Sequence, residues 1–191
     1  MMSELIKDYI ILDGFYTNPE EVRDYALSLP FWVKGNYPGL RTNPAEPWAS
    51  DNLKNHMQNI IASKGLKITN WGDGYNTAYQ YTLETCGSWI HHDSNNSWAC
   101  VVYLTPDAPK EAGTTFYRHK ETGIYEHKRK QPDFNEEYQS PDKWEEIFRV
   151  DNVFNRAIIY RGNYYHRSAP EGFGTNKWNG RLFQTFFFDA E

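Results

Sequence analysis

The chain has 191 residues and a formal net charge of −5, a length typical of one domain and a charge that argues against a nucleic-acid-binding protein relying on overall attraction. Aromatic residues make up 17% of the sequence, which excludes a disordered chain, and its two cysteines are too few for a disulfide scaffold or an all-cysteine zinc site. No apolar run approaches the roughly 20 residues of a membrane span, and the start of the sequence lacks the pattern of a secretory signal. We therefore expect a folded, cytoplasmic protein without a membrane segment.

The N-terminal part, residues 1–75, predicts one strand and two helices that support a β-rich core. The strand is expected over residues 8–13. Asn18 suits the N-cap of the first helix, a proline occupies the first helical position, and the helix is expected to stop at Pro30. Ser50 is expected to cap the second helix, which a glycine then ends.

From residue 76 onward the pattern changes to short segments rich in β-branched and aromatic residues, separated by turns that contain Gly, Pro or Asn. Such a series of strands after two helices predicts a mainly β (α+β) fold, a jelly roll buttressed by N-terminal helices. We expect one domain over residues 1–191, with its core in residues 76–189. The predicted strands are 76–84, 98–105, 114–118, 156–161, 164–168 and 181–188.

Residues 119–152 break this pattern because they form a long, strongly charged segment that also carries aromatic residues. Ser140, followed by proline, predicts a short helix that reaches Phe148, with Trp144 and Phe148 on its buried face. Long insertions between core strands are often functional.

The most informative stretch is WIHHD, residues 89–93. In an extended segment, His91 and Asp93 point to one side and His92 points to the other. His91 and Asp93 can therefore grip one metal ion from the end of a strand, and His166 is the expected third ligand. Two imidazoles and one carboxylate form the facial triad typical of non-haem Fe(II) oxygenases, which leaves positions for a cosubstrate and O₂.

Arg181 opens the last predicted strand and strengthens this interpretation. Its guanidinium can form a bidentate pair with a carboxylate of a cosubstrate that chelates the metal. A simpler interpretation stays open, in which His91 is a strand-end residue, His166 is a satisfied core histidine and Arg181 is a solvated charge.

Residues 79–189 resemble the double-stranded β-helix of the Fe(II)/2-oxoglutarate-dependent oxygenases, most closely the prolyl-hydroxylase-like branch. That branch has, in order, a tyrosine, a glycine turn, His-x-Asp, an apolar strand with a tyrosine, a Gly-Thr strand, a distal histidine and a basic residue. Residues 9–29 are also similar to it, whereas 30–75 and 119–152 match least. The corresponding residues here are Tyr81, Gly87, His91, Asp93, Tyr103, Gly113, Thr114, His166 and Arg181.

By this resemblance, His91, Asp93 and His166 would bind Fe(II). The protein would be a 2-oxoglutarate-dependent dioxygenase, a hydroxylase whose substrate is a peptide, a protein or a small molecule. No nucleic-acid partner is expected.

The resemblance also implies residues for the cosubstrate. Arg181, Tyr103 and Tyr81 would hold 2-oxoglutarate, with its distal carboxylate on Arg181. Ser168 lies two residues after His166, so strand parity turns it toward the cosubstrate as well.

The sequence departs from the family pattern in two places. The interval from His166 to Arg181 is longer than is common in the family, which puts the role of Arg181 in question and leaves Lys177 as the nearby basic alternative. The branch that repairs alkylated nucleic acids has a second arginine shortly after the first, at the position where this sequence has Phe187, and this difference counts against that activity.

Substrate identity is beyond these motifs, because the walls of the site are expected from the loop 30–50, the insertion 119–152 and the loop 171–180. Two other classes stay open. A cupin-like isomerase or zinc hydrolase would use the same three ligands without needing Arg181. A non-catalytic jelly-roll module, for example for carbohydrate, would use aromatic platforms and no metal.

Overall fold

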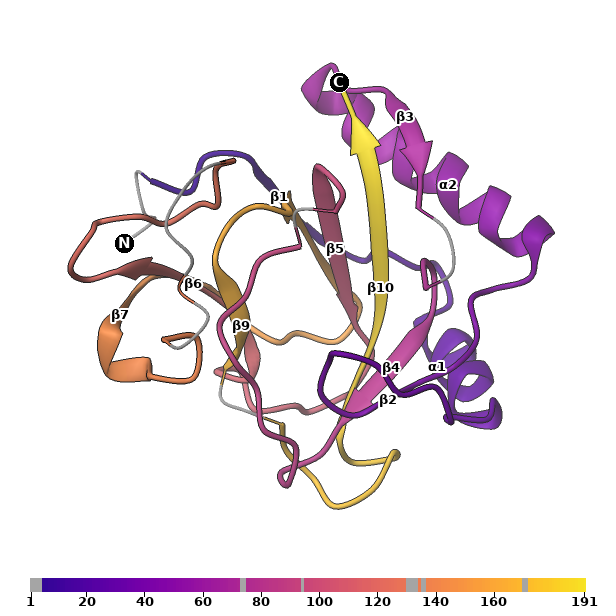
Figure 1. The fold of residues 1–191 in the computed structure, drawn as a ribbon. Helices are drawn as coiled ribbons and strands as arrows, with labels where there is room; N and C mark the ends of the chain where they lie inside the picture. Colours follow the sequence, from indigo (N-terminus) through magenta and orange to yellow (C-terminus); the bar gives the residue numbers. More distant parts are fainter. Residues whose placement is uncertain (1–4, 73–74, 94, 130–133, 135–136, 170–171) are drawn as a thin grey trace.

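Two antiparallel sheets and two α-helices account for most of the regular structure (Figure 1). None of the described helices is long and apolar enough to cross a membrane. The structure is a computed structural model that describes residues 5–72, 75–93, 95–129, 134, 137–169 and 172–191.

The larger sheet is organised around β10 (Arg181–Ala190), the longest described strand. β10 pairs antiparallel with β5, β4 and β3, and the order along the sheet is β1–β8–β5–β10–β4–β2, with β3 beside β10. Every residue of β10 except Asp189 is buried. The other strands of this sheet are β1 (Tyr9–Asp13), β2 (Leu40–Arg41), β3 (Ile68–Trp71), β4 (Tyr79–Thr82), β5 (Trp98–Tyr103) and β8 (Arg156–Arg161).

The smaller sheet has the order β7–β6–β9 and packs on the inner face of the larger one. Phe116 and Val150 of the smaller sheet share one apolar cluster with Ile158, Tyr160 and Phe187 of the larger sheet. The two sheets therefore form the two layers of a jelly roll. The strands of the smaller sheet are β6 (Gly113–His119), β7 (Trp144–Val150) and β9 (His166–Ala169).

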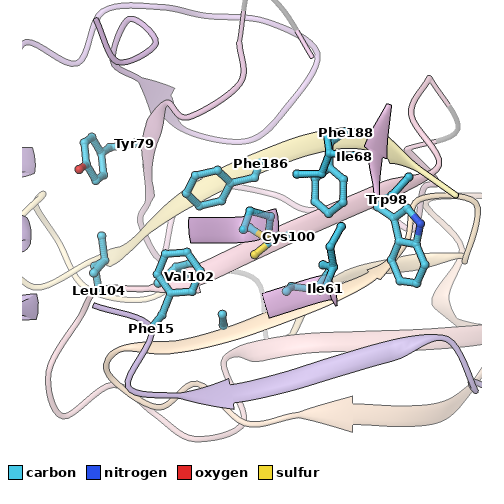
Figure 2. Packing of buried hydrophobic residues seen from close by; sticks show 14 of the residues in the cluster. Phe15, Ile61, Ile68, Tyr79, Trp98, Cys100, Val102, Leu104, Phe186 and Phe188 are labelled. Atoms are coloured by element: carbon cyan, nitrogen blue, oxygen red, sulfur yellow. The ribbon is translucent and has the colours of Figure 1, made fainter. Parts of the chain in front are cut away.

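Both α-helices cover the outer face of the larger sheet (Figure 1). Phe186 and Phe188 of β10 and Ile61 of α2 belong to one buried cluster, which Figure 2 shows from close by. The sheet thus has an apolar core on each of its two faces. The helices are α1 (Pro19–Ser28), α2 (Pro47–Ile61) and the short 3₁₀ helices η1 (Ala62–Lys64) and η2 (Pro141–Lys143).

The predicted helices are present with adjusted boundaries. The first has Asn18 at its N-cap, but the Asn18 side chain bonds to Glu21 rather than to the backbone. The second begins at Pro47, before Ser50, because proline suits a first helical position. The hydroxyl of Ser50 instead accepts a hydrogen bond from the indole of Trp71 at 2.9 Å.

The strand predictions hold best for the central, largely buried strands that are rich in β-branched and aromatic residues. The strands expected over 98–105, 114–118, 156–161 and 181–188 correspond to β5, β6, β8 and β10. β4 is shorter than predicted, β9 begins later, and β2 and β3 arise in a region where no strand was expected.

The short helix predicted from Ser140 to Phe148 is wrong. Only η2 is helical, and Trp144 begins strand β7, which pairs along the edge of β6. Trp144 is buried and Glu145 exposed, and Phe148 faces Phe116 across the pair of strands. Pairing with β6 satisfies the backbone of this segment, so the sheet overrides the helical spacing of its two aromatic residues.

Gly113, the first residue of β6, provides a test of this packing. A Cβ atom on Gly113 would lie 1.8 Å from the carbonyl oxygen of Val150, whereas one on Gly87 would meet nothing within 4 Å. We expect Gly113→Ala to lower the free energy of unfolding by about 2 kcal/mol or more, measured by urea denaturation. Gly87→Ala is the matched control, and equal losses in the two variants would contradict this packing.

Candidate active site

His91 and His166 lie side by side although they are distant in the sequence. Each backbone amide donates a hydrogen bond to the carbonyl of the other residue, at 3.0 Å and 2.8 Å. Their ring centroids are 4.4 Å apart. The main chain therefore fixes the relative position of the two imidazoles.

Asp93 completes a group of three metal-binding side chains. Its carboxylate lies 3.3 Å from Nε2 of His166 and 3.9 Å from Nε2 of His91. One potential ligand atom from each of the three residues lies within 4.8 Å of the other two. The structure thus brings together the three residues predicted as metal ligands.

Hydrogen bonds on the far side of each ring select the nitrogen that faces Asp93. Nδ1 of His91 lies 3.0 Å from the carbonyl oxygen of Trp89, and Nδ1 of His166 lies 2.9 Å from that of Tyr164. Because a carbonyl only accepts, each Nδ1 carries a hydrogen, and the neutral ring keeps its Nε2 lone pair for a metal.

The electrostatic environment favours the forms that bind a metal. Burial, and then the proximity of His166, lower the pKa of His91, which keeps its imidazole neutral at neutral pH. Burial alone would raise the pKa of Asp93, but the proximity of His166 and His91 and the charge of Arg41 outweigh it and lower the pKa to about 2. The site therefore offers a neutral imidazole at His91 and a carboxylate at Asp93.

The three residues open into a cavity between the two sheets. Alternate residues of β10 form one wall, as the pleat of a strand requires. The smaller sheet contributes Thr114 of β6, its pairing partner Ser168 of β9, and the two residues that precede Ser168. The residues from these three strands are Arg181, Phe183, Thr185, Phe187, Thr114, His166, Arg167 and Ser168.

Arg181 is buried in this cavity, with only 3% of its surface exposed. Its Nε and Nη2 atoms donate to the backbone carbonyls of Ala112 and Gly113 at 3.0 Å and 3.2 Å, and its Cζ lies 4.4 Å from the ring centre of Phe183. No carboxylate from the described residues forms an ion pair with it. A buried guanidinium that is fixed by backbone carbonyls but has no acidic partner carries an uncompensated positive charge. It is therefore suited to bind an anionic ligand.

Two of the other residues predicted for the cosubstrate lie beside Arg181 or in the same cavity. Ser168 lines the cavity, with its hydroxyl 3.2 Å from that of Ser88. Tyr103 is fully buried, its ring centre is 5.5 Å from Cζ of Arg181, and its hydroxyl lies 2.7 Å from that of Thr114.

Tyr81 lies outside the group, contrary to its predicted position. Within the described chain, the cavity lining includes Gln80 but not Tyr81. Gln80 pairs with Phe183 of β10, which faces the cavity, whereas Tyr81 pairs with Leu182, which faces the helices. The Tyr81 ring packs on Phe31, with centroids 4.9 Å apart. Only the pairing of β4 with β10 shows that Gln80, rather than Tyr81, faces the cavity.

Sequence reasoning also missed two buried groups at the site. Tyr160 places its hydroxyl 2.9 Å from Nε2 of His166, and Arg41 lines the cavity from β2. Tyr160 lies in a predicted strand, where alternation was its only signal. Arg41 lies in a two-residue strand that shows no periodicity.

His92 lies outside the metal-binding group, as the alternation predicts. Its ring stacks on that of His127, with centroids 4.0 Å apart and planes 9° apart. Burial and the neighbouring His127 lower the pKa of His92 to about 4.

Of the three segments expected to form the walls, one contributes to the cavity. Tyr37, Pro38 and Arg41, from the loop 30–50, are among its lining residues. The described residues of 119–152 and 171–180 do not line it. The first of these segments instead contributes β7, the edge strand of the smaller sheet.

Comparison with known protein families gives one match, which covers nearly the whole chain. A family model described as "Family of unknown function (DUF6445)" matches residues 6–188. The chain belongs to the DUF6445 family. A search of curated proteins found no match.

Solved structures share the fold of this DUF6445 protein at low sequence identity. HygX from Streptomyces hygroscopicus, with nickel and 2-oxoglutarate bound, has a TM-score of 0.60 and 13% identity over 96% of this chain and 83% of that one. A prolyl hydroxylase from Trichoplax adhaerens, in complex with a hypoxia inducible factor peptide fragment, has a TM-score of 0.58 and 14% identity over 95% and 83% of the two chains. A prolyl-4-hydroxylase from Pseudomonas putida has a TM-score of 0.56 and 12% identity over 95% and 91%. The predicted jelly roll, or double-stranded β-helix, is thereby confirmed.

The metal-binding capacity of the DUF6445 protein can be tested with Mn(II). Asp93→Asn keeps the shape of the side chain but removes its charge, so we expect Mn(II) affinity to fall on the order of a hundredfold, measured by isothermal titration calorimetry. His92→Ala changes the neighbouring residue, which is not in the ligand group, and should leave the affinity within a few-fold of the wild type. Equal losses in both variants would argue against this ligand set.

Proposed function

We propose that this DUF6445 protein is an Fe(II)- and 2-oxoglutarate-dependent oxygenase that hydroxylates a C–H bond. The observation that carries the proposal is that the group of His91, Asp93 and His166 shares one cavity with the buried guanidinium of Arg181. The first feature suits a metal and the second suits an anion. A diacid that chelates the metal needs both.

Fe(II) fits the donor set of the site. Two imidazole nitrogens and one carboxylate are the ligands of the facial triad, and that triad leaves positions for other ligands. His91 and His166 present Nε2 because their Nδ1 atoms are bound to backbone carbonyls. These two residues and Asp93 would hold the metal.

2-Oxoglutarate fits the cavity through its distal carboxylate, which would bind Arg181. The two backbone carbonyls that accept from Nε and Nη2 orient this guanidinium, and no carboxylate of the described residues pairs with it. Thr114 and Ser168 offer hydroxyl groups in the same lining. The hydroxyl of Tyr103 forms a hydrogen bond with that of Thr114. When bound, iron and 2-oxoglutarate supply the oxidation of a C–H bond by O₂, with release of succinate and CO₂.

The remaining task of the chain is to shape a site from which water is largely excluded. Phe183, Phe187, Ala99 and Val101 give the larger sheet an apolar wall next to the charged groups. In such surroundings, electrostatic contacts to a bound diacid are stronger than in water.

The fold neighbours support this class of enzyme and both kinds of substrate. HygX has been solved with hygromycin B and the Trichoplax enzyme with a peptide fragment, so a small molecule and a peptide are each compatible with the fold.

We also propose a single domain and a cytoplasmic location. The domain is supported by β1 and β3, N-terminal strands that pair with β8 and β10 of the core. The location is supported by two cysteines that are both free thiols.

Anaerobic titration of the metal-free protein with Fe(II) and then 2-oxoglutarate tests the proposal. The bidentate complex of Fe(II) with a keto acid absorbs weakly at ~500 nm, so we expect this band to appear. Iron binding without the band would contradict the oxygenase and favour a cupin-like enzyme, and absence of iron binding would favour a non-catalytic module.

The role of Arg181 can be tested separately. Removal of a bidentate charged contact lowers affinity on the order of a hundredfold, and we expect this loss for 2-oxoglutarate in Arg181→Gln, with Mn(II) affinity unchanged. Lys177→Gln is the matched control, because the amine of Lys177 binds the carbonyl of Leu27, and neither residue lines the cavity. Unchanged 2-oxoglutarate affinity in Arg181→Gln would refute the assignment.

A further inference from the structure

Arg41 is a second buried arginine at the site, and the proposed chemistry has no use for it. It lines the cavity that contains Arg181 and also a neighbouring outer cavity. The outer cavity reaches His91 and Asp93, but its described lining does not include Arg181. A molecule approaching the metal ligands through the outer cavity therefore meets Arg41.

The guanidinium of Arg41 is held in place on two sides. Its Nε donates to the side-chain oxygen of Gln80 at 2.6 Å, and the amide nitrogen of Gln80 donates to the carbonyl of Pro38, also at 2.6 Å. Its Cζ lies 3.7 Å from the ring centre of Tyr37, so the aromatic ring covers one face. These contacts leave Nη1 and Nη2 without a hydrogen-bond partner among the described residues.

Arg41 also lacks an acidic partner. Only 9% of its surface is exposed, and no carboxylate of the described chain forms an ion pair with it. Asp93 is the nearby anion that influences it, but the Asp93 carboxylate contacts His166 at 3.3 Å and belongs to the metal-binding group. Burial lowers the pKa of Arg41, yet an arginine stays charged in proteins. A fixed, buried cation with a free edge is the arrangement that binds anions.

We propose that Arg41 binds a carboxylate group of the primary substrate, which makes that substrate a carboxylic acid. This inference rests on the proposed oxygenase function. Two terminal nitrogens on one edge of a guanidinium match the two oxygens of a carboxylate. The body of the acid would lie in the outer cavity, where Tyr37, Tyr75 and Trp89 supply aromatic walls. Arg41 then selects the substrate, and Arg181 serves the cosubstrate.

Phenylacetate and its neutral analogue phenylacetamide are probes that differ in the charge that Arg41 would recognise. Both are added to protein loaded with Mn(II) and saturating 2-oxoglutarate, so that Arg181 is already occupied. The paramagnetic relaxation of the ring protons reports binding near the metal. We expect phenylacetate to bind about tenfold or more tightly than phenylacetamide, since a charge-assisted pair is lost in the amide.

Arg41→Gln should remove this preference in protein that still binds Mn(II) and 2-oxoglutarate. Arg149→Gln is the matched control, because Arg149 lies in β7 and pairs with Glu146 outside both cavities, and it should keep the preference. The comparison of the two probes on the wild type tests the inference even if Arg41→Gln does not fold.

The possible results separate the two levels of the argument. Equal binding of the two probes to wild-type protein that binds Mn(II) and 2-oxoglutarate would overturn the role of Arg41 alone. A preference that survives in Arg41→Gln would do the same, and tighter binding of phenyl phosphate than of phenylacetate would overturn the assignment to a carboxylate. Failure of the wild type to bind Mn(II) or 2-oxoglutarate would overturn the proposed function together with this inference.

Discussion

The structure depends on the alternation of side chains along β10. Leu182, Phe186 and Phe188 point to the helices and belong to the outer core, whereas Arg181 and Phe183 point between the sheets and line the cavity. Because successive residues of a strand face opposite sides, a shift of one residue would exchange these two sets. Pairing with three other strands fixes the register of β10, so the same interaction builds the core and orients the cation of the site.

The chemistry of the site is divided between the two sheets. His166 comes from the smaller sheet, whereas Arg181 and Arg41 come from the larger one. His91 lies on neither sheet but is attached to His166 through the backbone. The cavity between the layers thus holds the metal-binding group and two buried guanidinium groups, of which Arg41 also borders the outer cavity beside His91 and Asp93.

Local patterns in the sequence were enough to predict the jelly roll and the strands of its centre, and the His-x-Asp motif with a distal histidine and arginine pointed to His91, Asp93, His166 and Arg181. These local patterns were not enough where one segment is compatible with two structures. The apolar spacing in 144–150 suits a helix, and only the partner strand β6 decides for a strand. Gln80 and Tyr81 are adjacent in one strand, and which of them faces the site follows from pairing with β10. No sequence pattern indicated that Arg41 lies at the site, since its strand is only two residues long and is defined by pairing with β4 and Val33.

The loop that carries Arg41 is closed upon itself. Val33 and Arg41 exchange backbone hydrogen bonds at 3.0 Å in both directions, and Gly39, with a φ of +79°, makes the turn where a Cβ atom would collide with the carbonyl of Tyr81. The segment between these two residues supplies Tyr37 and Pro38 to the cavity but none of the three metal-binding residues. On the proposed function, specificity and chemistry therefore come from different parts of the chain: residues 33–41 supply the arginine proposed to bind the substrate, and the metal-binding group lies outside this segment.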